Sequence, residues 1–527
     1  MFNRTSLQAA AALVSMSLLA GCGLFSDDVA EGQNKITVGT TSAPTTLDPA
    51  AAWDNSWELY RNVFQTLLSF PTGSTSPRSD AADCKFTDTT STVLRCKLRD
   101  GLTFSDGAAL DAKAVKYSID RIRTIDVPGG PSGLLGSLDR VETLGGQEVV
   151  FHLKESDATF PFILATPAMS IVDPAKYPAD KLRQDGGVTG SGPYTLASYA
   201  ENDRAELVRN PGYKGFADIK NDAVTIRYFK ESEAMVAALR KKEIDATYRG
   251  LTAQEVLDLQ DSKLAGDPLQ VVESTGADIR YLVFNPKDPS VSELAVRQAV
   301  AQLVDREELV KRAYKGTAEP LYSMVPKGIA GHTTGFYDHY GDPSATKAKK
   351  LLRAAGIDKP VALTFWYTTD RYGSGTAAEF AELKRQLDSS GLFRVTLRSR
   401  PWKDFQVGYQ NGQYPVFGRG WFPDFPDPDN FIAPFVGKEN VLSTPYDKPE
   451  ITASLLPETR RESDRGTSQV SEKFAEAQEI LVEDVRLLPL WQGKLYIAAS
   501  EDIAGSERAL DPQTVMQMWE LHRKASW

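Results

Sequence analysis

The chain of 527 residues has few of the side chains on which catalytic and metal sites depend. It contains four histidines and three cysteines, with no H-E-x-x-H motif and no metal-ligand spacing of histidine with cysteine. A Gly-x-Ser-x-Gly elbow and a Walker P-loop are also missing from the sequence. The sequence therefore contains no motif that would support metalloprotease, serine hydrolase or nucleotidase activity. We predict a protein that is not an enzyme and that uses no metal and no cofactor.

Long apolar runs are equally scarce. The N-terminal run, residues 9–20, spans 12 residues and contains two serines, whereas a membrane-spanning helix needs roughly 20 apolar residues. Arg4 precedes this run and Leu19-Ala20-Gly21-Cys22 ends it, which is the pattern of a cleaved signal peptide. The tetrapeptide resembles the bacterial lipobox, whose cysteine is diacylated and anchors the mature chain stably. We predict a lipoprotein signal peptide over 1–22, lipidation of Cys22, and a flexible tether over 23–35.

Basic residues do not dominate any part of the chain. Lysine and arginine number 60 against 70 acidic residues, which gives a formal charge of −10. Neither a basic stripe nor a Lys/Arg tract is present, so nucleic acid is excluded as a partner. An acidic body is compatible with a cationic or zwitterionic ligand.

Two cysteines remain once Cys22 is assigned to the lipid. A signal peptide implies an oxidising compartment, in which Cys84 and Cys96 are expected to form a disulfide. The bond would close a loop of about 13 residues, worth roughly 3 kcal/mol in the chain-entropy model. Turn-rich polar residues followed by a strand pattern lie between the two cysteines. We therefore interpret the pair as a clamp across a hairpin.

Short β-branched or aromatic runs alternate with amphipathic helical patterns, which is typical of α/β lobes. Capping residues predict where three helices begin. Asp111 would cap the first, Asp305 and Glu308 have capping-box spacing at the second, and Ser344 would cap a third that ends at Gly356. We predict strands at 35–39, 93–98, 148–153, 205–209, 223–229, 280–284, 361–367, 394–398, 415–418 and 488–498.

Eight short segments follow one another in order along the chain. They are 46–49 (TLDP), 62–68 (NVFQTLL), 98–107 (LRDGLTFSDG), 190–194 (GSGPY), 209–213 (RNPGY), 284–285 (FN), 296–299 (VRQA) and 305–306 (DR). Each alone is weak, because glycine and proline recur in turns. Together, from about residue 36 to the C-terminus, they resemble the large solute-binding proteins of dipeptide, oligopeptide and nickel ABC importers.

The resemblance implies an α/β, two-lobed fold like that of periplasmic binding proteins, of type II and the enlarged peptide-binding class, with a hinge and an interlobe cleft. Lobe I would comprise 36–70, 189–275 and 495–527, with 71–188 inserted as a subdomain, and lobe II would comprise 276–494. The implied protein is a monomer, lipid-anchored on the extracytoplasmic face of the cell membrane. It would capture di- or oligopeptides and deliver them to an ABC permease, whose transmembrane subunits work with cytoplasmic ATPases.

The resemblance also suggests ligand-binding residues. In peptide-binding relatives, an aspartate in a Trp-x-x-Asp pattern pairs with the ligand's α-ammonium, and Asp424 matches it, with Trp421 walling the pocket. The competing interpretation is a proline-rich surface loop in which Asp424, Asp427 and Asp429 are solvated or cap turns. We expect Asp427 and Asp429 to fix this loop. The prolines between these aspartates count against a calcium loop.

The candidate for the ligand's carboxylate is Arg371, which precedes Asp424 by about 53 residues, as an arginine does in dipeptide-binding relatives. The chain departs from their Arg-Pro pattern, because Asp370 and Tyr372 flank this arginine. Asp370 could neutralise Arg371 or turn it outward, and longer ligands would then be favoured. Trp402 lies where relatives place an aromatic near the ligand, and Tyr372 is a further lining candidate.

Other readings remain open at this point. Relatives also bind nickel chelates, haem, glutathione or oligosaccharides, although the scarcity of histidine and methionine disfavours a bare metal ion. The same liganded lobe pair could also act as a receptor for a peptide signal.

Overall fold

The computed structural model describes residues 34–51, 56–368, 370–373, 375–444 and 446–525. The predicted signal peptide, Cys22 and nearly all of the predicted tether lie outside the described residues. Within the described ranges, no helix combines the length and the apolar composition that crossing a bilayer requires.

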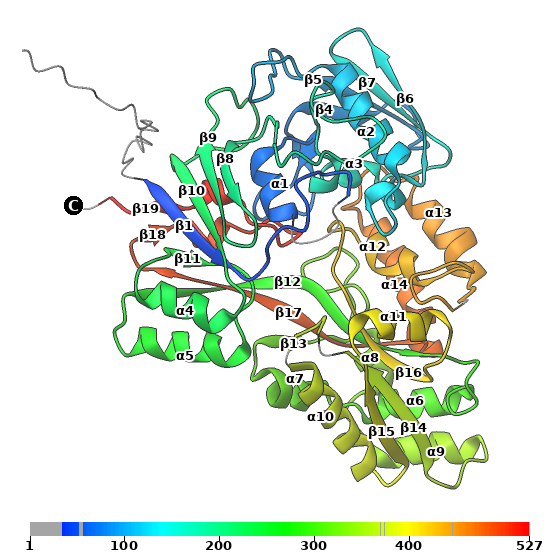
Figure 1. Cartoon of the computed structure of the whole chain (residues 1–527). Helices are drawn as coiled ribbons and strands as arrows, with labels where there is room; N and C mark the ends of the chain where they lie inside the picture. The colour runs from blue at the N-terminus through cyan, green and yellow to red at the C-terminus, as the bar shows by residue number, and fades with distance from the viewer. Residues whose placement is uncertain (1–33, 52–55, 369, 374, 445, 526–527) are drawn as a thin grey trace, which may run out of the picture. The chain divides into compact units, whose positions relative to one another are not determined.

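One large mixed sheet organises the folded part of the chain (Figure 1). Its strands β1 and β10, and its strands β14 and β15, pair in parallel, whereas its other long pairs are antiparallel. In spatial order the strands are β15 (Phe393–Ser399), β14 (Val361–Tyr367), β16 (Val416–Trp421), β12 (Leu269–Phe284), β17 (Leu487–Ser500), β11 (Ala246–Thr247), β1 (Lys35–Thr40), β10 (Ala223–Tyr228), β9 (Arg204–Arg209) and β8 (Tyr194–Ala200), with β13 (Ala318–Pro320) paired to β17.

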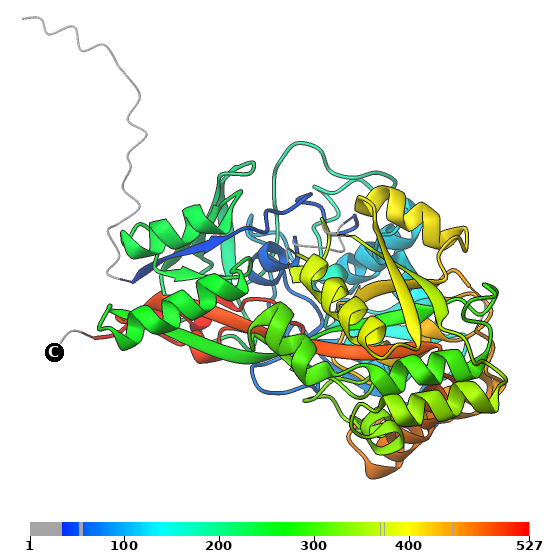
Figure 2. The ribbon, with the colours of Figure 1, turned by 90° about the horizontal axis from the view of Figure 1, so that it is seen from below.

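Strands β12 and β17 are the long pair that belongs to both halves of this sheet, and they run side by side in Figures 1 and 2. Their register shifts between Thr275 and Ile279, where residues 276–278 bulge, and bulges bend and twist a strand pair. A second register shift lies between Arg280 and Tyr281, and Tyr281 is paired with Pro489 of β17. A proline is tolerated in a central strand at such an irregularity.

A second, antiparallel sheet carries the disulfide. It consists of β4 (Ala82–Phe86), β5 (Val93–Leu98), β7 (Glu148–Leu153) and β6 (Leu138–Leu144) in spatial order. Cys84 and Cys96 are direct cross-strand partners and are joined by a disulfide. The predicted clamp across a hairpin is therefore confirmed. Two short pairs complete the strands: β2 (Leu68–Ser69) with β3 (Arg78–Ser79), and β18 (Ile503–Ala504) with β19 (His522–Arg523).

The helices begin where the sequence supplies caps. Asp111 accepts hydrogen bonds from the first turn of α2, Asp305 caps α7 and Ser344 caps α9. Glu308 does not complete a box with Asp305 and binds Arg312 instead. The helices are α1 (Trp57–Val63), α2 (Ala112–Ile125), α3 (Phe160–Leu164), α4 (Ser232–Arg240), α5 (Ala253–Leu264), α6 (Leu294–Leu303), α7 (Arg306–Tyr314), α8 (Gly335–Tyr340), α9 (Ala345–Ala354), α10 (Gly375–Ser389), α11 (Trp402–Gln410), α12 (Asp429–Ile432), α13 (Leu456–Thr459) and α14 (Ser468–Asp484).

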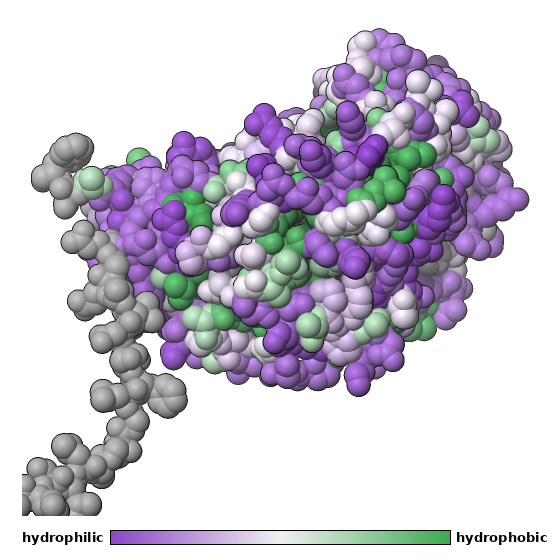
Figure 3. All heavy atoms as spheres, turned by 90° about the horizontal axis from the view of Figure 1, so that it is seen from above, coloured by the Kyte–Doolittle hydropathy of each residue, from purple (hydrophilic) through white to green (hydrophobic). Residues whose placement is uncertain are grey.

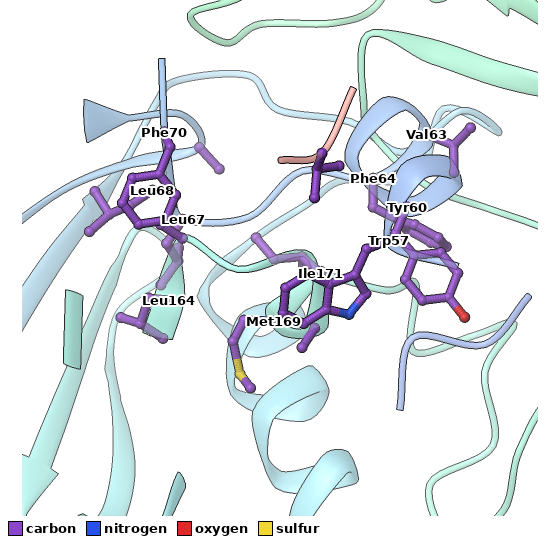
Figure 4. Packing of buried hydrophobic residues seen from close by; sticks show 14 of the residues in the cluster. Trp57, Tyr60, Val63, Phe64, Leu67, Leu68, Phe70, Leu164, Met169 and Ile171 are labelled. Atoms are coloured by element: carbon purple, nitrogen blue, oxygen red, sulfur yellow. The ribbon is translucent and has the colours of Figure 1, made fainter. Parts of the chain in front are cut away.

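Separate apolar cores lie on the two faces of the β12–β16 region. Alternate residues of β12 face opposite ways: Leu282 and Phe284 join a cluster with α6, α7, α9 and α10, and Tyr281 and Val283 join one with α11, α12 and α14. A third cluster unites α1, the second sheet and the C-terminal tail. In it, Trp57 faces Met169 and Ile171 (Figure 4). A small fourth core lies under α4 and α5.

The predicted α/β architecture is confirmed, and the strands predicted at 93–98, 148–153 and 361–367 are β5, β7 and β14. Several predicted strands were too short. The strand predicted at 280–284 is only the end of β12, and the strands predicted at 415–418 and 488–498 stop before the ends of β16 and β17. Glycines and polar residues in the missed parts hide the strand pattern. The lobe boundaries at 275/276 and 494/495 fall within β12 and β17.

The C-terminal tail contacts α1 through a buried ion pair between Asp511 and Arg61. Asp511 is 3 % exposed and lies 3.4 Å from the guanidinium of Arg61. Its other oxygen accepts backbone N–H groups of Gln513 and Val515. Burial raises the pKa of Asp511 to about 6, against the opposing effect of Arg61.

This carboxyl predicts a specific pH dependence of stability. Between about pH 4 and pH 6 the folded carboxyl holds a proton that the unfolded one has released, so its contribution to stability falls as pH rises. Asp511→Asn fixes a neutral side chain. We expect the free energy of unfolding of the wild type, relative to this variant, to fall by about 3 kcal/mol across that window, as measured by urea denaturation at several pH values. Parallel profiles for the two proteins would contradict the assignment.

Candidate functional site

The end of β16 presents a strand edge. Every residue of β16 pairs with β12, whereas β14 pairs only with Val416 and Phe417 of β16. In the described part of the chain, no strand pairs with Gly418 to Trp421 on the side away from β12. Main-chain groups at such an edge can pair with an extended peptide. The predicted ligand-binding residues lie around this edge.

Asp424 follows β16 and is 5 % exposed. Its Oδ2 accepts a hydrogen bond of 2.9 Å from the side-chain amide of Asn430, and its backbone N–H donates to Asn430 Oδ1 at 2.9 Å. The indole N–H of Trp421 donates to that same oxygen at 3.2 Å. Asn430 therefore joins the two residues that the sequence places in one pocket. The amide of Gln513, from the C-terminal tail, binds the main-chain carbonyl of Asp424.

The neighbouring aspartates are neutralised by arginines. Arg465 binds Asp427 and Arg460 binds Asp429 through bidentate ion pairs with N···O distances of 2.8 to 2.9 Å. Burial acts to raise the pKa of Asp429, but the charge and hydrogen bonds of Arg460, together with the charge of Arg465, lower that pKa overall. The three aspartates are not solvated, because all three are buried. The other part of that alternative, turn capping, is correct for Asp427, whose Oδ1 accepts the backbone N–H of Asp429 at 2.9 Å.

A second group forms at the start of α11. The rings of Trp402 and Tyr372 meet edge to face with centroids 5.7 Å apart, and the guanidinium of Arg371 stands 5.6 Å from the Trp402 ring. Asp370 accepts hydrogen bonds from the Thr368 hydroxyl and, at 2.9 Å, from the backbone N–H of Trp402. These two donors lower the pKa of Asp370. Asp370 therefore holds the N-terminal start of α11. Arg371 itself is exposed.

Tyr372 of the second group and Arg280 of β12 meet at Gly420 of β16. A Cβ at this glycine would lie 3.0 Å from Cε1 of Tyr372 and 2.2 Å from Nη1 of Arg280. Arg280 is a residue that sequence reasoning missed. An arginine inside the apolar run RYLVF is a signal, because arginine is almost never fully buried without a partner.

Two surface hollows are lined by other residues. One, of about 450 Å³, lies beside β15 and α10, and the other, of about 410 Å³, lies on α2. Charged side chains line much of both. Figure 3 likewise shows a face that is largely hydrophilic, with apolar patches between the polar side chains. Ligand pockets usually combine apolar walls with a few convergent polar groups, which favours the aromatic surroundings of the β16 edge over either hollow.

Comparison with known proteins gives consistent results. Residues 76–443 match the model of the family described as bacterial extracellular solute-binding proteins, family 5 Middle. The chain is 24 % identical over 492 residues to the probable D,D-dipeptide-binding periplasmic protein DdpA of Escherichia coli (strain K12), covering 90 % of this chain and 91 % of that protein. It is 26 % identical over 484 residues to the glutathione-binding protein GsiB of Salmonella paratyphi A, covering 89 % and 91 %.

The fold is that of two-lobed periplasmic peptide-binding proteins. One solved structure with this fold is the dipeptide-binding protein from Pseudoalteromonas sp. SM9913 in complex with Met-Leu. Its TM-score is 0.75 at 21 % sequence identity, and the alignment covers 93 % of this chain and all of that one.

The ion pairs behind Asp424 predict a large stability effect. Arg465→Met would leave the buried Asp427 carboxylate without its cation, which typically costs about 3–5 kcal/mol. Arg461→Met is the matched control, because this neighbouring arginine is exposed and should change the free energy of unfolding by less than about 0.5 kcal/mol. Urea denaturation measures both. A control-sized effect at Arg465 would show that the pair does not hold the loop.

Proposed function

Because the chain belongs to family 5 of the bacterial extracellular solute-binding proteins, we propose that it captures short peptides at the β16 edge and delivers them to an ABC permease. The observation that carries this proposal is the edge of β16 from Gly418 to Trp421, where no strand of the described structure pairs on the side away from β12. Asp424 follows this edge, is buried and accepts a hydrogen bond from the Asn430 amide. A carboxylate at the end of the edge can accept charge-assisted hydrogen bonds from the α-ammonium of a peptide.

The strand edge supports a peptide rather than another solute. Main-chain pairing with Gly418 to Trp421 would bind a ligand backbone without reading its side chains. Trp421, Tyr372 and Trp402 would supply the apolar walls. The names of the relatives also support a peptide ligand. One is named for binding a D,D-dipeptide and another for binding glutathione, and the solved structure is a complex with Met-Leu.

The lobes predicted from the sequence become part of this proposal. Lobe I (36–70, 189–275 and 495–527, with 71–188 inserted) and lobe II (276–494) would close about the two strands that connect them. The bulge at 276–278 in β12 supports a hinge there. A monomer is sufficient for this cycle.

Substitution of Asp424 tests the function directly. We expect Asp424→Asn to weaken binding of tri-alanine by about 10- to 100-fold, because a charge-assisted contact to the ammonium is lost. N-acetyl tri-alanine has no ammonium and should lose nothing further. Calorimetry on protein freed of co-purified peptide measures both dissociation constants. The surface variant Asp447→Asn is the control. Equal affinity of the wild type and Asp424→Asn for the free peptide would refute the role of Asp424.

We also propose that Cys22 carries the lipid that holds the protein at the extracytoplasmic face of the membrane. In cells, the wild type should partition with membranes, and Cys22→Ser should release the chain or leave its signal peptide uncleaved. Membrane fractionation with intact-mass measurement checks this. Membrane retention of a cleaved Cys22→Ser chain would exclude the anchor.

A further inference from the structure

Arg280 is a buried cation with much of its hydrogen-bonding capacity unused. The residue is 7 % exposed, and within the described structure its Nε is buried without a hydrogen-bond partner. Nη1 donates to the carbonyl of Ile279 at 3.2 Å. The carboxylate of Asp278 is 3.6 Å from Nη1, which is beyond hydrogen-bond distance. Guanidinium groups in proteins stay charged, so this side chain is suited to an additional anion.

Aromatic rings hold this guanidinium in place. The rings of Tyr372, Trp491 and Phe422 have their centroids 4.5, 5.0 and 5.1 Å from its central carbon. Stacking on aromatic faces leaves the in-plane N–H donors available for a planar partner such as a carboxylate. Phe422 is 43 % exposed, so the cluster reaches the surface on this side.

The side chain of Arg280 also points toward the strand edge. Arg280 lies on β12, directly opposite Gly420 of β16. Because a Cβ at Gly420 would lie 2.2 Å from Nη1, the guanidinium crosses the face of β16 where there is no side chain. It thereby extends from β12 toward the edge that is open to a ligand.

The other buried carboxyl of this cluster is already engaged. Glu379 Oε2 accepts hydrogen bonds from the Tyr314 hydroxyl and the Trp491 indole. Burial raises the pKa of Glu379 despite these bonds and the nearby charge of Arg280. The hydrogen bonds of Glu379 Oε2 therefore come from Tyr314 and Trp491, and the carboxylate paired with Arg280 is that of Asp278, 3.6 Å from Nη1.

We propose that Arg280 binds the C-terminal carboxylate of a short peptide whose ammonium lies at Asp424. This inference rests on the proposed function and names its second anchor. Four residue steps separate Gly420 from Asp424, a span of at most about 14 Å, so the two anchors fit a peptide of roughly two to four residues. Arg371, which the sequence suggested for the carboxylate, lies exposed against Trp402 at the rim of the site.

Paired ligands test the assignment. Tri-alanine and its C-terminal amide differ only in the carboxylate, and we expect the wild type to prefer the acid by about 10- to 100-fold. Arg280→Met keeps much of the side-chain volume and should abolish this preference, while its affinity for the amide stays close to that of the wild type. Gly420→Ala displaces the guanidinium without removing it and should reduce the preference as well. Arg394→Met, an exposed change of the same type on β15, should retain it.

Each remaining outcome has a definite meaning. If Arg280→Met keeps the acid preference, or Arg371→Met alone removes it, the carboxylate is not at Arg280 and the proposal is overturned. The same holds if the wild type binds acid and amide equally, although peptide capture then stands. If the wild type binds neither form, and a random tripeptide library with free termini does not raise its melting temperature, the proposed function itself fails. Should Arg280→Met not fold, Gly420→Ala and Arg371→Met still decide the question.

Discussion

The pairing of β12 with β17 is the constraint on which the rest of the structure depends. These two strands share a ladder from Leu269 opposite Ser500 to Val283 opposite Leu487, and the remaining long strands of the sheet are arranged on either side of them. The ladder fixes the register of β16 through β12, and so it determines where Gly420 and Trp421 lie. The bulge is accommodated by close packing: a Cβ at Gly493 would lie 2.2 Å from Oδ1 of Asp278.

Four buried charged residues lie around the β16 edge: Asp424, Asp427, Asp429 and Arg280. Bidentate pairs lock Asp427 and Asp429 from behind, so the turn after β16 is rigid without help from a ligand. Asp424 and Arg280 are also buried. The Asp424 carboxylate accepts a hydrogen bond from the Asn430 amide, and Arg280 lies 3.6 Å from Asp278, while its Nε lacks a hydrogen-bond partner within the described structure. The bidentate pairs hold the loop, and the unused donor of Arg280 is suited to a ligand.

Much of the fold could be predicted from the sequence because local signals agreed with tertiary packing. The strand 361–367 alternates its buried residues, Leu363 and Phe365, with more exposed neighbours, and the caps Asp111 and Ser344 act within one turn of their own helices. The first half of β12 was missed because its pairing is long-range and its sequence includes a bulge with Gly276. At the site, Asp424 could be proposed from a motif. The role of Asp370 at α11 and the reach of Arg280 across Gly420 depend on contacts between segments far apart in sequence, which no local pattern encodes.

The two proposed anchors, Asp424 and Arg280, have a consequence for ligand selection. A zwitterionic peptide would bring an ammonium to Asp424 and a carboxylate to Arg280 in one binding event, and the net charge of the complex would not change. A ligand with only one of these charges would gain only one of the two charge-assisted contacts. Discrimination would then arise from the two termini of the peptide, and its side chains need not be recognised. The overall charge of −10 matters little to this choice, since solvent-exposed charges beyond about 10 Å are largely screened at 0.1 M salt.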